Sequence, residues 1–488
     1  MYTQYDMPLQ EAQAAPFCAQ LIAQDLGRDL ARFLYPLLVT LDQRLDKRLV
    51  RTFLQTIAVI ITFRDRMHGL WLSELGGHLL GPEHERAGTK RISNLLHSPN
   101  WRTSLIEDFL LQQATSRLQE ISALGDEGLV IWDEGVLEKA ESLKLEGLSA
   151  VRSSKARRLT RIKPGYYTPP RGPIFVPGVN TLGLIVVGLH ERSGPPQLAV
   201  LRCWTGRGPL ASKKREQEVR VLLSVAMQWG RGVIHIFDQG FAGSPWLGMC
   251  LQCLQRVVVR WAHNYQLIDE QGRTRKAWEI ARGKRPWGRR QIWDARRRTW
   301  RMVGVLAFPV RHPDYPQVPL WLVVSRPGKG HKPWYLLTNE EVSTERQAWR
   351  VVFAYARRWQ IEMTWRFGKS ELGWEGPRLH KWEVRLKLLL MAALAYAFLL
   401  TRLGNEHLAV RCWLLRHYCH RTGQRARQTA MPLYRLRLAI SRLWQEHPPD
   451  FVALARRRSS EARPPTASVS RITVVVEEAV GLSQGSFV

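Results

Sequence analysis

The chain has 488 residues, 45% of them hydrophobic, and its 72 Lys and Arg against 42 Asp and Glu give a formal net charge of +30. This length predicts roughly two to four domains, and this hydrophobic content excludes a chain that is disordered throughout. An excess of positive charge on this scale favours a polyanionic partner, nucleic acid first, over charge that serves solubility alone.

The N-terminus, the cysteines and the longest apolar run indicate a cytoplasmic protein. The opening residues MYTQYDMPLQEAQ lack the basic-then-apolar pattern of a signal peptide, and six Cys in so long a chain do not predict a disulfide scaffold. The run LLLMAALAYAFLL, residues 388–400, is too short to span a bilayer. We therefore expect a buried core helix there and no membrane partner.

Residues 1–125 are expected to form a helical, DNA-binding N-terminal region. TFLQTIAVIITF and LIEDFLLQQATSRL carry apolar residues at helical spacing. Between them, WLSELGGHLL and TKRISNLLHS are two short helical patterns, a layout compatible with either a helix-turn-helix or an ordinary bundle. Lys90 and Arg91 in the second pattern slightly favour DNA contact.

Residues 126–262 have an α/β pattern. Strands are expected at LVIWD, LGLIVVGL and QLAVLRCW, with HERSGPP between the last two as a hairpin signal. The helix pattern KKREQEVRVLLSVAMQW, the strand VIHIFD, the helix SPWLGMCLQCL and the strand RVVVRW follow. Alternating strands and helices of this kind predict a mixed sheet flanked by helices.

Residues 263–347 interrupt this pattern with a β-rich insertion. A segment rich in Arg, Lys and Trp is followed by the strand-like pieces VGVLAFPV, PLWLVVS and KPWYLLT. Helical spacing returns in residues 348–405, which we expect to close the α/β region. Residues 406–488 are expected to be helical and basic, ending in a linker-like segment, RRRSSEARPPTAS.

Three acidic residues are candidates for one metal site. Asp133 and Asp238 each end a predicted strand, and the first and fourth strands of such a sheet can lie side by side. Glu362, on a helix packed across the sheet, could complete the set. Three carboxylates together repel one another and favour two Mg²⁺ or Mn²⁺ ions, which activate water or a 3′-hydroxyl for phosphoryl transfer. The alternative is that each acid is an ordinary strand end or surface charge.

The predicted helix around Glu362 carries basic residues on the same face. At about 100° per residue, Tyr355, Arg358, Glu362 and Lys369 fall within about 60° of one another, with Arg366 beside them. Arg358 and Lys369 could bind phosphate oxygens of DNA. The alternative is a solvated face with Arg358 and Glu362 as an i, i+4 ion pair. A neighbouring apolar stripe, expected to dock on the sheet, consists of Ala354, Ile361, Trp365 and Leu372.

The spacing of Tyr355, Arg358, Glu362 and Lys369, Y-x2-R-x3-E-x6-K, resembles the signature of the DDE transposases of the bacterial insertion-sequence-four family. FDQGFAG around Asp238 and VIWDEG around the first Asp look like that family's aspartate motifs. A β-rich insertion between the second Asp and the Glu is also a family feature. The segment after the first Asp, which includes RSSKARRLTRIK, departs from the short hairpin of a minimal core.

This resemblance implies a ribonuclease H-like core and two Mg²⁺ held by Asp133, Asp238 and Glu362. It implies that the residues matching the signature hold transposon-end DNA near the cut. It also implies that a flipped base stacks on an insertion tryptophan, for which the candidates are Trp287, Trp293, Trp300 and Trp334.

The function implied is cut-and-paste DNA transposition. The protein would bind terminal inverted repeats, free the ends through a hairpin intermediate, and join their 3′-hydroxyls to target DNA. A homodimer would hold two ends in a synaptic complex, at the nucleoid in the bacterial cytoplasm. The alternatives are an inactive or domesticated DNA-binding protein derived from such an enzyme, and a metal-dependent nuclease with the same core.

Overall fold

A computed structural model of the protein describes residues 18–62, 70–139, 142, 144–153, 172–294, 299–328, 331–419 and 433–451. The chain divides into two compact units, Met1–Pro449 and Asp450–Val488. All elements discussed below belong to the first unit. Within the predicted basic segment RSSKARRLTRIK, residues 154–163 lie outside the described part of the chain.

The N-terminal part of the described chain is helical. Its helices are α1 (Ala19–Phe33), α2 (Tyr35–Asp42), α3 (Lys47–Thr62), α4 (Leu72–Leu80), α5 (Glu85–His97) and α6 (Ser104–Ala123). The two short predicted patterns form α4 and α5, which approach so closely that a Cβ at Gly88 would lie 2.2 Å from the Gly76 carbonyl oxygen. Arg91 turns inward, and its Nε donates to Thr52 Oγ1 of α3 at 2.8 Å. Arg91 therefore serves packing rather than the DNA contact that its sequence position suggested.

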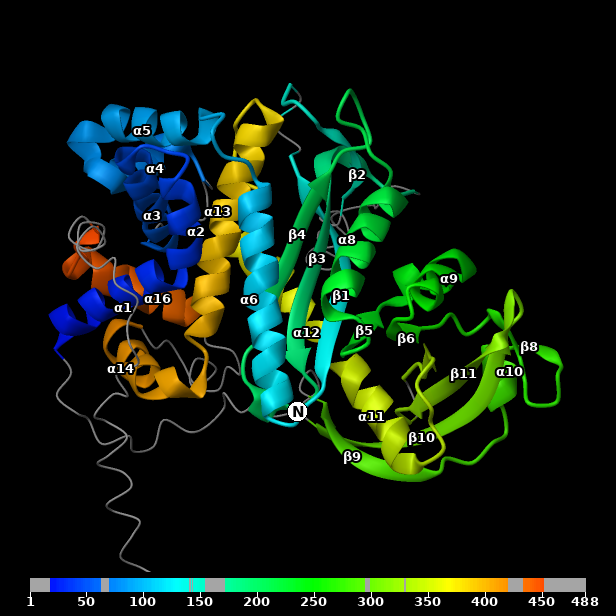
Figure 1. The fold of residues 1–488 in the computed structure, drawn as a ribbon. Coiled ribbons are helices and arrows are strands. Elements are labelled where there is room, and N and C mark those ends of the chain that lie inside the picture. Colours follow the sequence, from blue (N-terminus) through cyan, green and yellow to red (C-terminus); the bar gives the residue numbers. More distant parts are fainter. Residues whose placement is uncertain are drawn as a thin grey trace, which may run out of the picture. The chain divides into compact units, whose positions relative to one another are not determined.

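One sheet of 12 strands dominates the described structure (Figure 1). The strands are β1 (Gly128–Glu138), β2 (Ser149–Arg152), β3 (Phe175–Gly188), β4 (Gln197–Trp204), β5 (Val233–Phe237), β6 (Arg256–Arg260), β7 (Gln266–Ile268), β8 (Thr274–Lys276), β9 (Gly288–Asp294), β10 (Thr299–His312), β11 (Tyr315–Arg326) and β12 (Trp334–Thr338). Their order is β2-β3-β1-β5-β6-β12-β11-β10-β7-β8, with β4 paired to β3 and β9 to β10.

The strand pairing confirms the predicted neighbours and corrects one strand end. β1 and β5, the first and fourth predicted strands, pair in parallel, as do β5 and β6. β1 does not end at Asp133 as predicted, because β3 pairs with it antiparallel along its whole length, through Glu138. The insertion strands extend this same sheet, since β12 pairs antiparallel with β6.

Further helices pack against the sheet or, in the case of α14 and α16, against the other helices. These are α8 (Lys214–Trp229), α9 (Ser244–Gln252), α10 (Ala277–Ala281), α11 (Glu345–Ala356), α12 (Trp359–Ser370), α13 (Trp382–Thr401), α14 (Leu408–Tyr418) and α16 (Leu433–Glu446). On one face, Val130 and Trp132 of β1 join a core cluster with Leu222 of α8 and Trp246 of α9. Side chains alternate along a strand, so Asp133 and the residues two positions away face α12 instead.

The long apolar run forms α13, which lies beside α6 (Figure 1). This helix is long and apolar enough to cross a membrane by length and composition alone, and 89% of its most apolar window is buried within the protein. It contacts α3, α6 and β4. Its environment agrees with the predicted core helix.

Candidate active site

Asp133 and Asp238 lie at the same level of two adjacent parallel strands. The register of β1 and β5 pairs Ile131 with Ile236, and two further residues along each strand lead to the two aspartates. Parallel strands present their carboxyl ends at one edge of a sheet, where α/β proteins bind their ligands. The predicted meeting of the two aspartates at a sheet edge therefore agrees with the register.

The charges of Asp238 and Glu362 both act on Asp133. Burial raises the pKa of Asp133 to about 7; Arg358 lowers it, Asp238 and Glu362 raise it, and a hydrogen bond from Trp365 lowers it. Charge interactions weaken with distance, so the three acids are considered together. We call Asp133, Asp238 and Glu362 the acid cluster.

The backbone after β5 holds Asp238 in place. Asp238 has extended backbone angles and precedes a short 3₁₀ helix, Gln239–Phe241. Its Oδ1 accepts a hydrogen bond from the backbone N–H of Gly240 at 2.7 Å. One of its carboxylate oxygens is thus engaged by the chain itself, which orients the side chain.

Glu362 forms an ion pair with Arg358 across one turn of helix. The Glu362 side chain is 57% exposed and that of Arg358 18% exposed. This is the i, i+4 pair that the alternative interpretation of the helix face foresaw. In the described ranges, no group of three or more His, Cys, Asp or Glu side chains, the acid cluster included, lies in positions that could hold a metal ion.

The signature residues do not share one continuous helix, so that prediction is wrong. α11 ends at Ala356 and α12 begins at Trp359. The N–H groups of Gln360 and Ile361 donate to carbonyl oxygens three residues earlier, at 3.1 and 3.2 Å. Tyr355 therefore lies on α11, whereas Glu362 lies on α12. The predicted apolar stripe is confirmed, with every member buried: Ala354, Ile361, Trp365 and Leu372.

Tyr355 connects the acid cluster to an arginine that the sequence analysis missed. Its side chain is buried, which raises its pKa; Asp238 acts in the same direction, while Arg358 and a hydrogen bond from Arg260 oppose the rise. Arg260 ends β6, and the β5–β6 register, Phe237 with Val259, brings it level with Asp238. An arginine at the end of the predicted strand RVVVRW was the available signal.

The other predicted DNA-binding residues lie apart from Arg358. Lys369 is further along α12, and its Nζ donates to the Val136 carbonyl oxygen of β1 at 2.7 Å. The same Nζ lies 3.8 Å from a carboxylate oxygen of Glu375. Arg366 is exposed on α12. The basic residues are thus spread along α12, from its N-cap to its last turn, and do not converge on one point.

Trp334 is placed beside the acid cluster. Its ring packs edge-on against Tyr355, with ring centroids 5.0 Å apart. Trp287 and Trp300 are 43% and 58% exposed. The side chain of Trp293 lies outside the described part of the structure. Of the candidate tryptophans, Trp334 is the one seen in contact with a signature residue in the described chain.

A buried, neutral histidine links strands of the sheet by hydrogen bonds. Trp132 Nε1 donates to His235 Nδ1 at 2.9 Å, and His235 Nε2 lies 3.0 Å from Gln255 Oε1. Burial lowers the pKa of His235 to about 4, so the ring is neutral, accepting at Nδ1 and donating at Nε2. These hydrogen bonds connect β1, β5 and the residue that precedes β6.

Comparisons with known proteins agree with this geometry in part. Residues 212–398 match the family model described as a transposase DDE domain, a range that includes Asp238 and the signature residues but not Asp133. This match supports a DDE transposase. No curated protein matches the chain.

One solved structure that matches is a cryo-EM structure of a piggyBac transposase synaptic complex with hairpin DNA. The identity is 12%, the match covers 96% of this chain and 90% of that chain, and the TM-score is 0.38. So low a TM-score does not establish a common fold.

Proposed function

We propose that this chain, whose residues 212–398 match a transposase DDE domain, is a cut-and-paste DNA transposase of the insertion-sequence-four type. The observation that carries the proposal is the acid cluster itself. Asp133 and Asp238 occupy equivalent positions of adjacent parallel strands, and the negative charges of Asp238 and Glu362 both act to raise the pKa of Asp133. The order β4-β3-β1-β5-β6, with β1, β5 and β6 parallel, supports a ribonuclease H-like core.

The acid cluster suits divalent metal ions. Asp133, Asp238 and Glu362 offer hard oxygen donors, and added positive charge would offset the burial and the neighbouring negative charges that raise the pKa of Asp133. These residues would hold Mg²⁺ or Mn²⁺, with two ions as the expected number. Such ions stabilise the charge that develops on the attacking and leaving oxygens of phosphoryl transfer.

The groups around the acids suit a DNA strand. Arg358 and Arg260 would bind phosphate oxygens on one side of the acid cluster, and Lys369 on the other. Trp334, which packs against Tyr355, is our choice for the surface that stacks a flipped base. The proposed substrates are the terminal inverted repeats of a bacterial insertion sequence and a target DNA, with a homodimer holding two ends at the nucleoid.

The decisive test is Glu362→Gln. The amide keeps the size of the side chain but removes its charge, so Mg²⁺-dependent cleavage of end DNA should fall by at least about 10²-fold. End binding should not weaken, since Glu362 repels phosphate and its neutralisation releases Arg358 from the ion pair. Both quantities are measured on the same labelled end duplex. Glu120→Gln, at a side chain 62% exposed on α6, is the matched control and should cut normally.

Full cleavage by the Glu362→Gln protein would remove Glu362 from the site. The wild-type protein distinguishes the alternatives. Binding of end DNA without Mg²⁺-dependent nicking indicates an inactive descendant of a transposase. Cleavage without joining of pre-cut ends to a target plasmid indicates a nuclease.

A further inference from the structure

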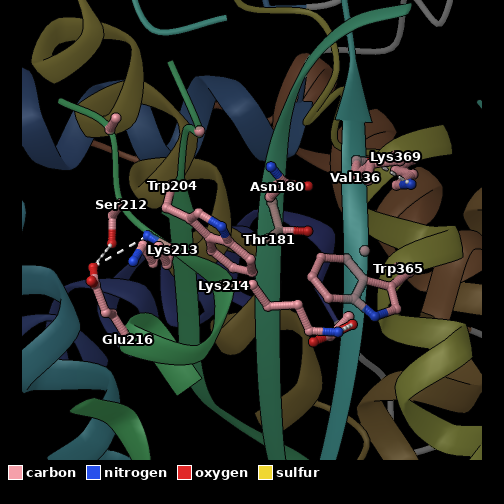
Figure 2. Close-up of a pocket in the computed structure, with 14 residues that line it drawn as sticks. Val136, Asn180, Thr181, Trp204, Ser212, Lys213, Lys214, Glu216, Trp365 and Lys369 are labelled. Atoms are coloured by element: carbon pink, nitrogen blue, oxygen red, sulfur yellow. Dashed lines mark hydrogen bonds and ion pairs between the residues drawn. The ribbon is translucent and has the colours of Figure 1, made fainter. Parts of the chain in front are cut away.

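A cleft of about 960 Å³ lies next to β1 on its β3 side, away from β5. Figure 2 shows the residues that line it. It is formed by the far end of β1, by β3 and β4, by the loop before α8, and by α12. The residues that line it and carry the argument are Asn180, Thr181, Trp204, Gly206, Lys213 and Trp365. Of its lining residues, only Lys369 has a role in the function proposed above.

The cleft opens directly from the catalytic strand. Glu134 and Gly135, which follow Asp133 on β1, form part of its wall. Trp365 forms another part, and the same side chain lowers the pKa of Asp133. If a DNA strand had one phosphate at the acid cluster, its neighbouring nucleotides would therefore lie at the cleft.

The rim of the cleft is positively charged on two sides. Figure 2 shows Lys213 and Lys214, at the start of α8, across from Lys369 on α12. Lys214 is neutralised locally by an ion pair with Glu134, and Lys369 holds the Val136 carbonyl oxygen. Lys213, which is exposed, adds charge at the mouth. This arrangement suits a chain of phosphates that passes over the rim.

The floor of the cleft offers polar groups between aromatic walls. Thr181 is fully buried, and its hydroxyl has no hydrogen-bond partner among the described residues. Because this hydroxyl is enclosed, the polar group open to the cleft is the side chain of Asn180, which is half-buried. Asn180 lies next to Thr181, and Trp204 and Trp365 stand on either side (Figure 2).

We propose that this cleft binds a few unpaired nucleotides of the DNA strand that continues from the phosphodiester held at the acid cluster. The inference rests on the proposed function. Its volume is near the upper end of the about 300–1,000 Å³ range of ligand sites, which is too small for a duplex but suits separated bases. Bases stack on aromatic side chains and present edges to polar groups, while lysines take the phosphates.

The test compares a blunt end duplex with the same duplex carrying a short thymidine tail at its 3′ or 5′ end. Fluorescence anisotropy is measured with Ca²⁺ in place of Mg²⁺, so that binding is observed without cutting. The wild-type protein should bind one tailed duplex about tenfold more tightly than the blunt one, as stacking of one or two bases provides. Gly206→Trp should reduce this preference to less than about twofold and leave blunt-duplex binding unchanged.

Gly206 suits this test because a Cβ there would meet nothing within 4 Å, so a bulky side chain fills the mouth without displacing its neighbours. Lys213→Ala is the second variant and should lower the preference about two- to fivefold. Lys276→Ala is its matched control. Lys276 stands at the N-cap of α10, where its backbone N–H donates to Glu279, as that of Lys213 before α8 donates to Glu216, and Lys276→Ala should leave the preference intact.

Two results would overturn the assignment: a wild-type protein that cuts end DNA yet shows no tail preference, or a folded Gly206→Trp protein that keeps it. If Gly206→Trp does not fold, an unchanged preference in Lys213→Ala overturns it as well. If the wild-type protein prefers tailed DNA and the variants lose this preference, but the protein never cuts DNA with Mg²⁺, the nucleotide-binding role of the cleft would stand and the transposase function would be rejected.

Discussion

Burial, with a smaller contribution from the charges of two neighbouring acids, disfavours the ionised form of Asp133. An Asp in an unfolded chain ionises near pH 3.9, whereas the pKa of Asp133 in the folded protein is about 7. Between these values the unfolded chain releases the proton and the folded protein keeps it. The folded state is therefore penalised progressively as the pH rises from about 4 to 7, and by a constant amount above pH 7.

We predict that Asp133→Asn stabilises the protein at high pH and abolishes its activity. Without divalent metal, its free energy of unfolding at pH 8 should exceed that of the wild type by about 1–3 kcal/mol, because the ionised carboxylate is removed and water screens part of the shift. The gain should vanish below pH 4, where the wild-type carboxyl is protonated in both states. Urea unfolding at the two pH values measures both quantities.

The exposed Asp25, whose side chain is 59% exposed, provides the control for that measurement. Asp25→Asn should show no such dependence on pH. A difference between Asp133→Asn and wild type that is the same at pH 4 and pH 8 would mean that charge is not its cause.

At the scale of single elements, two glycines make room for the helix that carries Glu362. Gly183 of β3 pairs directly with Asp133, and a Cβ there would lie 2.8 Å from the Trp365 ring of α12. A Cβ at Gly135 would lie 3.4 Å from the same ring. The bare backbone at these positions lets α12 seat against the sheet.

We predict that Gly183→Ala uncouples cleavage from DNA binding. The added methyl group must displace Trp365, which costs about 1–3 kcal/mol in a packed interior and shifts α12 relative to the aspartates. Cleavage with Mg²⁺ should fall at least about tenfold, while end binding changes less than twofold. Gly172→Ala, where a Cβ would meet nothing within 4 Å, is the control. Equal loss of binding and cleavage would point to general unfolding.

Local patterns in the sequence predicted part of the site, and tertiary contacts decided the rest. The strand that carries Asp133, the strand end at Asp238 and the apolar stripe along α11 and α12 follow from periodicity, which a sequence displays directly. The break between α11 and α12 does not, because its residues have ordinary helical character. At the break, Arg357 is buried and lies 3.5 Å from the Glu191 carboxylate, a partner far away in sequence.

The extent of β1 and the position of Arg260 beside the acids could also not be predicted from the sequence, because both depend on tertiary contacts. β1 continues past Asp133 because β3 pairs with it over its full length. Arg260 belongs to the site because β6 lies beside β5 in a definite register. A strand order and a register involve residues distant in sequence, and periodicity within one segment carries no information about either.

On the scale of the whole molecule, the insertion and the catalytic strands share one sheet and one core. The core cluster contains Val130 of β1, Val257 of β6, Leu322 of β11 and Leu337 of β12. An ion network joins the same parts of the protein at the opposite edge of the sheet, where the parallel strands begin. In it, Glu340, which follows β12, pairs with Arg256 at the start of β6 and with Arg350 of α11.

We therefore predict that the insertion and the catalytic strands unfold together. Thermal unfolding followed by calorimetry should show one transition for both, with equal calorimetric and van't Hoff enthalpies, because neither part keeps its buried surface without the other. Limited proteolysis in mild urea should likewise release no stable insertion fragment. Two resolved transitions, with a protease-resistant piece covering residues 263–347, would contradict the shared core.

The ion pair between Arg358 and Glu362 has a thermodynamic consequence. In the proposed function Arg358 binds a DNA phosphate and Glu362 a metal ion, so whichever ligand breaks the ion pair first lowers the free-energy cost of binding the other. Linkage requires the effect to be reciprocal: Mg²⁺ must tighten DNA binding by the same factor by which DNA tightens Mg²⁺ binding. We expect Ca²⁺ and end duplex titrations by calorimetry to show this positive cooperativity, and Arg358→Ala to lose it. Independent binding of the two in the wild-type protein would contradict the coupling.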